Sequence, residues 1–288
     1  MKTAFWRTLV GFLPEADLAQ CPGRSDLGFG EAYWNLLDQK IQAARWYVDA
    51  MCQRMPVNVE RGALPASCRP YLRTLQQEPR FSDFIEGKSA YRFGWVGLEN
   101  LAVYRRRVNS KFIADIQTHV ARLTDLDSLL RFCLPLHHEL RDFHLEEHFN
   151  ETDNRLAITQ SHTDLRTIYS AGDLHQRSKT SWLPSLLDQG ASLISVVRYE
   201  ERYFLLSGYH RAMALARNGQ WTVPALIMNV ECYEQTGIDG PGIFGPEIML
   251  GSKPPLFTDF FSPAAVEIPH RRTRLHITLR AEVEAVAV

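Results

Sequence analysis

Residues 203–212 read Tyr-Phe-Leu-Leu-Ser-Gly-Tyr-His-Arg-Ala and contain the turn around which the second half of the chain is organised. The aromatic and aliphatic run before Gly208 is typical of a short strand. The alanines and leucine after it favour a helix, which Asn218-Gly219 would end. We therefore expect a strand, a tight turn at Gly208 and a helix over 208–218.

The flanking residues extend this pattern on both sides. Residues 193–199 form another apolar run, and the polar residues 200–202 separate it from 203–206, so the two runs predict a hairpin. Residues 223–230 follow the helix as a further strand. Pro224 near its start suggests an edge strand or a first-residue position, because proline cannot donate to the ladder.

The turn at Gly208 has the chemistry of a phosphate site. Glycine permits a tight turn and lets a ligand approach the backbone closely. A helix start presents unpaired N–H groups and the positive end of its dipole. His210 and Arg211 would add donors, and Arg211→Ala would then weaken ligand binding without unfolding the protein. The alternative is a structural turn in which Arg211 pairs with a nearby carboxylate.

The order of these segments resembles the ParB/sulfiredoxin superfamily over roughly residues 180–230. Members share a helix ending in Gly, a strand, a turn, a strand ending in Gly-x-[His/Arg]-Arg, a helix and a Val-Pro strand. The matching stretches here are 185–190 (Ser-Leu-Leu-Asp-Gln-Gly), 193–198, 203–212 and 222–226 (Thr-Val-Pro-Ala-Leu). The resemblance implies a small α+β fold that binds nucleotide phosphates through Ser207, Gly208, Tyr209, His210 and Arg211.

The superfamily includes CTP-dependent partitioning switches, free-serine kinases, nucleases, sulfinic-acid reductases and regulators of DNA modification. Tyr209 stands where sulfiredoxins carry their nucleophilic Cys, which argues against a reductase. Partitioning proteins continue into a helix-turn-helix domain, whereas the residues after Val230 suggest loop and strand. The resemblance then implies a phosphotransferase acting on a small molecule, with ATP, ADP or CTP, with Mg²⁺, and with His210 as a catalytic residue. The alternatives are a non-catalytic regulatory or nucleic-acid-associated module, and a structural protein that kept the fold.

A serine-kinase-like reaction needs a carboxylate to activate the hydroxyl. Five acidic residues are unranked candidates, and each could equally be a solvated surface charge: Asp164, Asp173, Asp188, Glu200 and Glu201. Arg166 is a candidate second phosphate ligand, with an ordinary strand-edge position as the alternative.

The charge balance favours a nucleotide over a nucleic-acid polymer as the partner. The 288 residues contain 32 Lys+Arg and 33 Asp+Glu, and non-specific coating of nucleic acid needs a basic excess. The run 105–107 and the arginines at 271, 272 and 274 could contact nucleic acid or pair with local acids. We expect nucleotide binding with at most weak DNA binding.

The cysteine pattern and hydropathy predict a cytoplasmic protein without a membrane partner. Five scattered cysteines form no C-x-x-C pair, which argues against a disulfide framework or a Cys-rich zinc site. No apolar run reaches the roughly 18 residues that a membrane span requires. The six tryptophans are expected in the core.

The first half of the chain suggests helices. Apolar periodicity predicts a helix over 30–55 that Pro56 ends, and shorter helices near 71–77 and 110–122. Thr124 and Asp127 suggest a capping box that opens a helix over 126–132. The expected fold is α+β: a mainly helical region over 1–150, then a ParB/sulfiredoxin-like domain over 151–288. That domain would add strands at 155–159 and 275–280 and a Gly/Pro-rich loop over 238–255.

Four histidines gather within twelve positions: His137, His138, His144 and His148. On one helix, His137, His144 and His148 would share a face that could hold a metal. On a strand, alternation would instead group His144, Glu146 and His148. No firm metal-binding spacing is present, and a polar segment between domains is the alternative, so no metal ligand is assigned.

Overall fold

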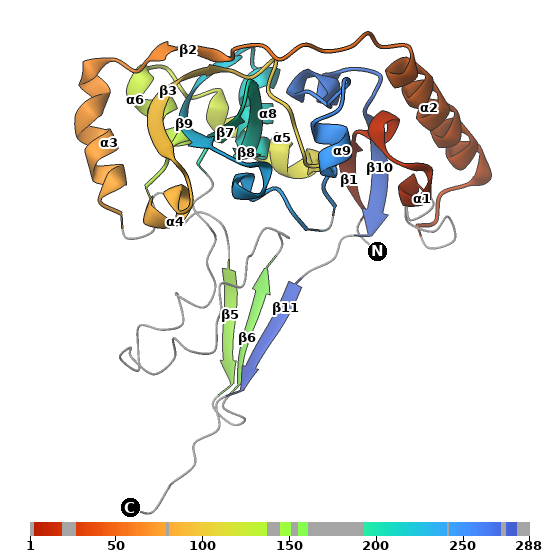
Figure 1. The fold of residues 1–288 in the computed structure, drawn as a ribbon. Coiled ribbons are helices and arrows are strands. Elements are labelled where there is room, and N and C mark those ends of the chain that lie inside the picture. The colour runs from red at the N-terminus through yellow and green to blue at the C-terminus, as the bar shows by residue number, and fades with distance from the viewer. Residues whose placement is uncertain are drawn as a thin grey trace, which may run out of the picture. The chain divides into compact units, whose positions relative to one another are not determined.

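The computed structural model describes residues 3–18, 27–78, 81–136, 145–150, 155–160, 193–240, 242–271 and 275–280 (Figure 1). The chain divides into two compact units. Unit 1 comprises Met1–Pro135 with Ser192–Arg271, and unit 2 comprises Leu136–Ala191 with Arg272–Val288. Helices and sheets are both present, which confirms the expected α+β class. The units differ from the predicted division at residue 150, and the strand pairing described below explains why.

A five-stranded sheet forms the centre of unit 1, in the order β2-β3-β9-β7-β8. Its strands are β2 (Glu60–Ala63), β3 (Ala90–Gly97), β7 (Ser195–Tyr199), β8 (Arg202–Ser207) and β9 (Thr222–Val230). Strands β7 and β9 pair in parallel, and every other neighbouring pair is antiparallel. The hairpin predicted over 193–206 is thus confirmed as β7–β8.

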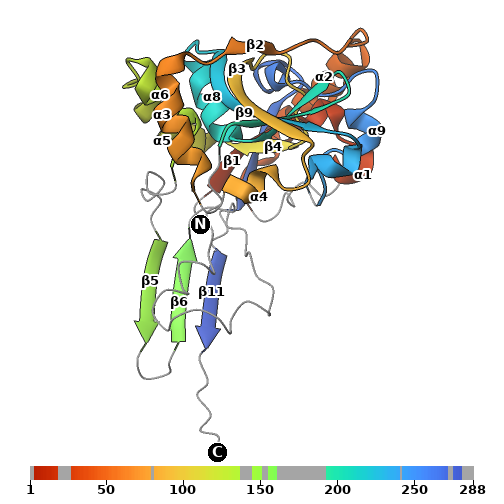
Figure 2. The same ribbon diagram turned by 60° about the vertical axis from the view of Figure 1, so that its left-hand side comes forward.

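Helix α8 (Tyr209–Arg217) provides the crossover between β8 and β9. Its residues Arg211–Ala216 are all buried, and helix α6 (Leu126–Cys133) contacts both α8 and β9 (Figure 2). Burial along β9 is nearly continuous rather than alternating, which is typical of a strand covered on both faces. The helix and strand predicted over 208–230 are therefore confirmed.

Pro224 is the third residue of a central strand, so neither the edge strand nor the first-residue position that the sequence suggested is correct. Strand β9 pairs with β3 through Pro224 opposite Trp95, and with β7 only from Leu226 onward. The N–H of Leu226 donates to the carbonyl of Ile194 on the β7 side. By the period of two, the nitrogen of Pro224 faces the same side, two residues before that ladder begins. The missing donor therefore falls where β7 has not yet joined.

A second sheet of unit 1 joins segments from both ends of the chain. Its order is β10-β1-β4, formed by β1 (Thr3–Thr8), β4 (Arg107–Asn109) and β10 (Val266–Arg271). Helix α5 (Ser110–Val120) follows β4 directly and contacts both β1 and α8. This pairing places the two termini of the unit in one sheet.

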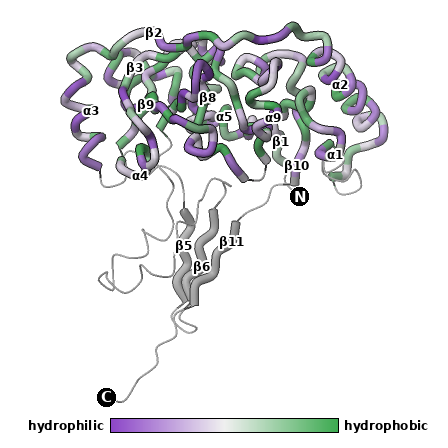
Figure 3. The backbone as a smooth tube through the Cα atoms, viewed as in Figure 1, coloured by the Kyte–Doolittle hydropathy of each residue, from purple (hydrophilic) through white to green (hydrophobic). Residues whose placement is uncertain are grey.

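Helix α2 (Glu31–Asp49) contacts β10 and buries Trp34, Leu37, Ala44 and Val48. Figure 3 shows apolar and polar residues mixed along its length. Helix α2 ends at Asp49, six residues before the predicted end at Met55, because the following segment makes tertiary contacts instead. The N–H of Arg54 donates to the carbonyl of Ser252, and its guanidinium binds the carboxylate of Asp259.

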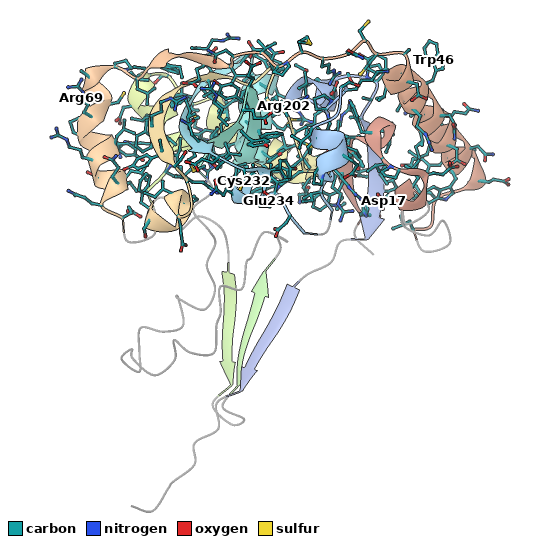
Figure 4. The ribbon with its side chains drawn as sticks, viewed as in Figure 1. Asp17, Trp46, Arg69, Arg202, Cys232 and Glu234 are labelled. Carbon is teal, nitrogen blue, oxygen red and sulfur yellow. The ribbon has the colours of Figure 1, made fainter. Side chains whose placement is uncertain are left out.

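The remaining α-helices of the described residues are short. They are α1 (Glu15–Leu18), α3 (Arg69–Gln76), α4 (Phe81–Ile85) and α9 (Pro246–Met249). Helices α3, α5 and α6 confirm three sequence predictions. The capping box of α6, however, pairs Asp125 with Ser128, so the predicted pair of Thr124 and Asp127 is wrong. Arg202 at the start of β8 binds the carbonyls of Met249, Leu250 and Gly251 and so connects the sheet with the end of α9 (Figure 4).

The N-terminal half is not purely helical. It contributes β1 to β4, and β3 and β1 pair with β9 and β10 from the other half. Sequence patterns missed these strands because their partners are remote in the chain.

Unit 2 contains a three-stranded antiparallel sheet in the order β11-β6-β5. Its strands are β5 (Leu145–Asn150), β6 (Arg155–Gln160) and β11 (Leu275–Arg280), so both strands predicted in these regions are confirmed. His148 therefore lies on a strand, not on the helix that would carry a metal-binding face. His137, His138 and His144 lie outside the described residues.

The core of unit 1 is rich in phenylalanine. Phe204, Phe244, Phe257 and Phe260 are among its largest fully buried side chains. Trp34 is buried as expected, whereas Trp46 is 73% exposed and points outward from α2 (Figure 4). Among the helices of the described residues, none combines the length and the apolar character that a membrane span requires.

We expect Asp259→Ala to lower the free energy of unfolding by about 2–4 kcal/mol. The side chain of Asp259 is 3% exposed, binds Arg54 through two oxygens and accepts the N–H of Leu256 at 2.7 Å. Its loss removes the acceptor of the Leu256 N–H and the carboxylate that neutralises Arg54, which keeps the carbonyl of Pro254 and the sulfur of Met51 as acceptors. Asp127→Ala is the control, because Asp127 and Arg131 are an exposed pair worth less than about 1 kcal/mol. Equal shifts in urea unfolding for the two variants would contradict the prediction.

Candidate functional site

Gly208 sits between β8 and α8 in the left-handed conformation, with φ 81° and ψ 16°. A Cβ atom there would lie 2.8 Å from the Cα and the Cγ1 of Ile194. The first helical bond of α8 then runs from the N–H of Ala212 to the carbonyl of Gly208 at 2.9 Å. Both the backbone conformation and the lack of space therefore require glycine at this turn.

Tyr209 is buried and holds α8 against the segment before β4. Its hydroxyl oxygen accepts the N–H groups of Tyr104 at 3.1 Å and Arg105 at 3.4 Å. The guanidinium of Arg105 lies over its ring, 5.4 Å from the centroid. Burial raises the pKa of Tyr209 well above its ordinary value, so the side chain stays a neutral phenol. These contacts assign Tyr209 a bracing role.

His210 connects the starts of α8 and α5. Its Nε2 accepts the backbone N–H of Asn109 at 3.2 Å, and its ring meets Phe112 edge-on at 4.8 Å. Asn109 in turn caps α5, because its side chain accepts from the N–H groups of Lys111 and Phe112. An accepting Nε2 places the proton on Nδ1 of a neutral imidazole. Nε2 therefore cannot act as a general base while this bond is kept.

Arg211 points into the protein and caps the end of α6. It is 8% exposed, its Nη1 donates to the carbonyl of Phe132 at 3.2 Å, and the guanidinium lies 6.0 Å from the ring centroid of Phe132. A cation at a helix C-terminus is favourable because the last carbonyls carry partial negative charge. Burial lowers the pKa of Arg211 to about 10. We therefore expect Arg211→Ala to destabilise the fold, which corrects the expectation that it would affect binding alone.

Ser207 closes the open end of the hairpin. Its Oγ lies 2.8 Å from the Oγ of Ser195 and donates to the carbonyl of Leu193. Arg166 and the carboxylate candidates Asp164, Asp173 and Asp188 lie outside the described residues.

The remaining two carboxylate candidates are far from the turn. Glu200 lies in the β7–β8 turn and Glu201 follows it, so both precede β8, whereas Gly208 follows the other end of that strand. Six strand residues span about 20 Å. Neither carboxylate can therefore act together with His210.

The start of α8 has the general features of a helix N-terminus, which favour an anion through the backbone. The N–H groups of residues 209–211 precede the first helical bond, and Gly208 supplies no side-chain cap. The positive end of the helix dipole lies at the same place. The structure therefore brings Ser207, Gly208, Tyr209, His210 and Arg211 together, but their described side-chain contacts are with the protein itself.

The basic run 105–107 is also engaged by the protein. Arg106 pairs with Asp17 at 2.9 Å and lies over Phe244. Arg107 lies over the ring of Trp6 at 5.0 Å, and its Nη1 is 3.4 Å from the Nε2 of His270. Of the two alternatives for this run, Arg106 therefore takes the pairing with a local acidic residue. The side chain of Arg271 and residues Arg272 and Arg274 lie outside the described part of the structure.

Sequence reasoning missed the partners that fix this turn. Tyr104, Asn109 and Phe132 supply the backbone groups that bind Tyr209, His210 and Arg211. No local pattern marks them, because they are distant in the sequence and act through their main chain.

Within the described ranges, no group of three or more His, Cys, Asp or Glu side chains is arranged to hold a metal ion. The cysteines of these ranges are free thiols; Cys52 and Cys232 are exposed, and Cys68 and Cys133 are buried.

Comparisons of the chain with protein-family models, with curated proteins and with solved structures found no match. The resemblance to the ParB/sulfiredoxin superfamily stays a prediction from the sequence.

We expect Gly208→Ala to lower the free energy of unfolding by about 2–4 kcal/mol, from the left-handed conformation and the contact with Ile194 together. Gly219→Ala is the matched control: its φ is 82°, but nothing lies within 4 Å of the added Cβ, so only about 1–2 kcal/mol is lost. Chemical unfolding of both variants measures the difference. Equal losses would show that the contact with Ile194 is relieved without cost.

We expect the protein to become less stable as the pH decreases, because of the lowered pKa of His270. Burial and the guanidinium of Arg107 lower the pKa of His270 to about 4, whereas the unfolded chain has a pKa of about 6.5. The unfolded chain therefore takes up the proton first, and stability decreases as pH falls from about 6.5 towards 4. Thermal melts at pH 7, 6 and 5 should show a smaller loss of Tm for His270→Gln than for the wild type. Parallel losses would refute this.

Proposed function

We propose that this chain binds the phosphate group of a nucleotide at the start of α8. The observation that carries the proposal is the left-handed turn at Gly208, which ends β8 and begins α8 without a side-chain cap. Backbone N–H groups at such a helix start, together with the helix dipole, favour a phosphate. The strand–Gly-x-His-Arg–helix order of the sequence supports the same ligand.

The surrounding side chains would make this site rigid. Tyr209, His210 and Arg211 each bind the backbone of a different segment, at Tyr104–Arg105, Asn109 and Phe132. A site held in place before binding loses less conformational entropy when its ligand arrives.

The size of the turn favours a nucleotide over a nucleic-acid polymer. One helix start can hold one or two phosphates, whereas a polymer needs a row of cations. The nearby arginines at 105 and 106 already contact Tyr209 and Asp17. A regulatory or nucleic-acid-associated module is therefore the alternative that the binding experiment distinguishes from a nucleotide-binding protein.

Phosphotransfer to a small molecule, with ATP, ADP or CTP and Mg²⁺, is the enzymatic form of this proposal. The hydroxyl of the acceptor would need a carboxylate. Glu200 and Glu201 lie at the far end of β8, and the other three carboxylates that the sequence suggested, Asp164, Asp173 and Asp188, lie outside the described residues. The bond between His210 and Asn109 makes His210 a positioning residue in this scheme.

We expect ATP, ADP or CTP to raise the Tm of the wild-type chain and to give a saturable heat of binding, with and without Mg²⁺. His210→Glu should weaken binding at least about tenfold, because it adds a negative charge in the first turn of α8, near the proposed phosphate. His210→Gln is the matched control, since its amide oxygen can still accept the N–H of Asn109. We expect His210→Gln to bind within about threefold of the wild type, whereas the tenfold loss expected of His210→Glu corresponds to about 1.4 kcal/mol.

The absence of any nucleotide effect on the wild type would overturn the proposal, as would equal binding by both variants. Submicromolar DNA binding with a steep dependence on salt would favour the nucleic-acid module instead. Conversion of ATP to ADP with an equal amount of a phosphorylated hydroxyl compound, serine being among the acceptors tested, would establish the enzymatic form.

A further inference from the structure

A groove of about 660 Å³ lies beside α2, on unit 1, away from the residues of the Gly208 turn. We call it the α2 groove. Its walls come from β1, α2, β10 and the segment after Phe257. Small-molecule sites commonly have volumes of roughly 300–1,000 Å³. The residues that line it include Phe5, Arg7, Leu36, Lys40, Phe261 and Glu267.

The walls of the α2 groove expose an unusual amount of apolar surface. Phe5 is 39% exposed, Leu36 is 51% exposed and Phe261 is 38% exposed. They come from three different elements, yet all three line this one groove. An apolar patch gathered in a concave site marks a place where a ligand or partner binds.

An aromatic wall extends from Phe5 towards α2. Phe5 meets Phe29 edge-on at 6.4 Å, and Phe29 stacks on Tyr33 at 4.4 Å. Trp34, which follows on the helix, is buried and donates its indole N–H to the carbonyl of Phe29 at 3.2 Å. This wall is therefore held in place from behind and is suited to the apolar body of a ligand.

Three charged groups line the α2 groove. The guanidinium of Arg7 donates to the carbonyls of Phe260 at 2.7 Å and Ser262 at 3.3 Å. Glu267 stands opposite Arg7 in the sheet register, and both its oxygens accept from the hydroxyl of Ser110 at 2.8 Å. Lys40 is exposed on α2. Two cations and one anion leave the groove with one net positive charge.

The volume lies within the range of small-molecule sites, and the apolar wall with one net positive charge beside it fits a small amphipathic anion.

We propose that the α2 groove binds a small amphipathic molecule with an apolar body and one negatively charged head. The apolar body would lie along Phe5, Leu36 and Phe261, and the head would lie near Lys40. This inference uses other residues than the nucleotide proposal and does not depend on it.

Three probes of equal chain length test the site in the full-length chain: decanoate, decanol and decyltrimethylammonium, each below its micellar concentration. Their heads carry one negative charge, no charge and one positive charge. We expect calorimetric titration to show saturable binding of decanoate, weaker binding of decanol and the weakest binding of decyltrimethylammonium.

Two variants separate the apolar and the charged contributions. Leu36→Gln should weaken decanoate and decanol alike, by about fivefold or more, because it removes apolar wall. Lys40→Gln should weaken decanoate by up to about fivefold and leave decanol unchanged. Trp46→Gln is the control: it removes a more exposed side chain from the same helix, but one that does not line the groove.

No saturable binding of any probe would overturn the inference. Equal affinity for the three heads, or losses that are the same in Trp46→Gln and Leu36→Gln, would also overturn it and indicate adsorption to exposed apolar surface. If the wild-type chain sediments as a dimer and Leu36→Gln sediments as a monomer, the groove would be assigned to a second copy of the chain instead. Unchanged melting temperatures of the variants show that each remains folded.

Discussion

The left-handed turn at Gly208 is the constraint on which the rest of unit 1 depends. It reverses the chain from β8 into α8 against the backbone of Ile194, in a space that admits no side chain. Because of this reversal, β9 returns beside β7 in parallel, and β9 then becomes the strand on which β3 also pairs. A displacement of the turn would therefore shift both sides of the central sheet.

The side chains around this turn act mainly on the protein's own backbone. Tyr209 fixes the segment before β4, His210 fixes the start of α5, and Arg211 satisfies a carbonyl at the end of α6. A motif of donors at a helix start invites the expectation that all of them face a ligand. In our proposal the backbone N–H groups bind the phosphate, and the side chains determine where those groups are.

The second sheet has a different origin, because it is formed by β1, β4 and β10 from distant parts of the chain. Arg7 and Glu267 are opposite each other in that sheet and become part of the α2 groove only through this pairing. Asn109 and Ser110 connect the two proposed sites in the chain, since the first binds His210 and the second binds Glu267. The two sites remain distinct in their residues and in the ligands that we propose for them.

The sequence by itself determined the elements whose contacts are local. The hairpin, α8 and β9 were predicted because apolar runs, a polar turn and Gly208 specify them within about forty residues, and α3, α5 and α6 follow from helical periodicity. The tertiary structure alone decided the pairing of β3 with β9, the central place of Pro224, the early end of α2 and the inward direction of Arg211. Each of these features depends on a backbone group from a segment that is remote in the sequence. Local sequence patterns do not indicate which carbonyl or N–H group will be close by after folding.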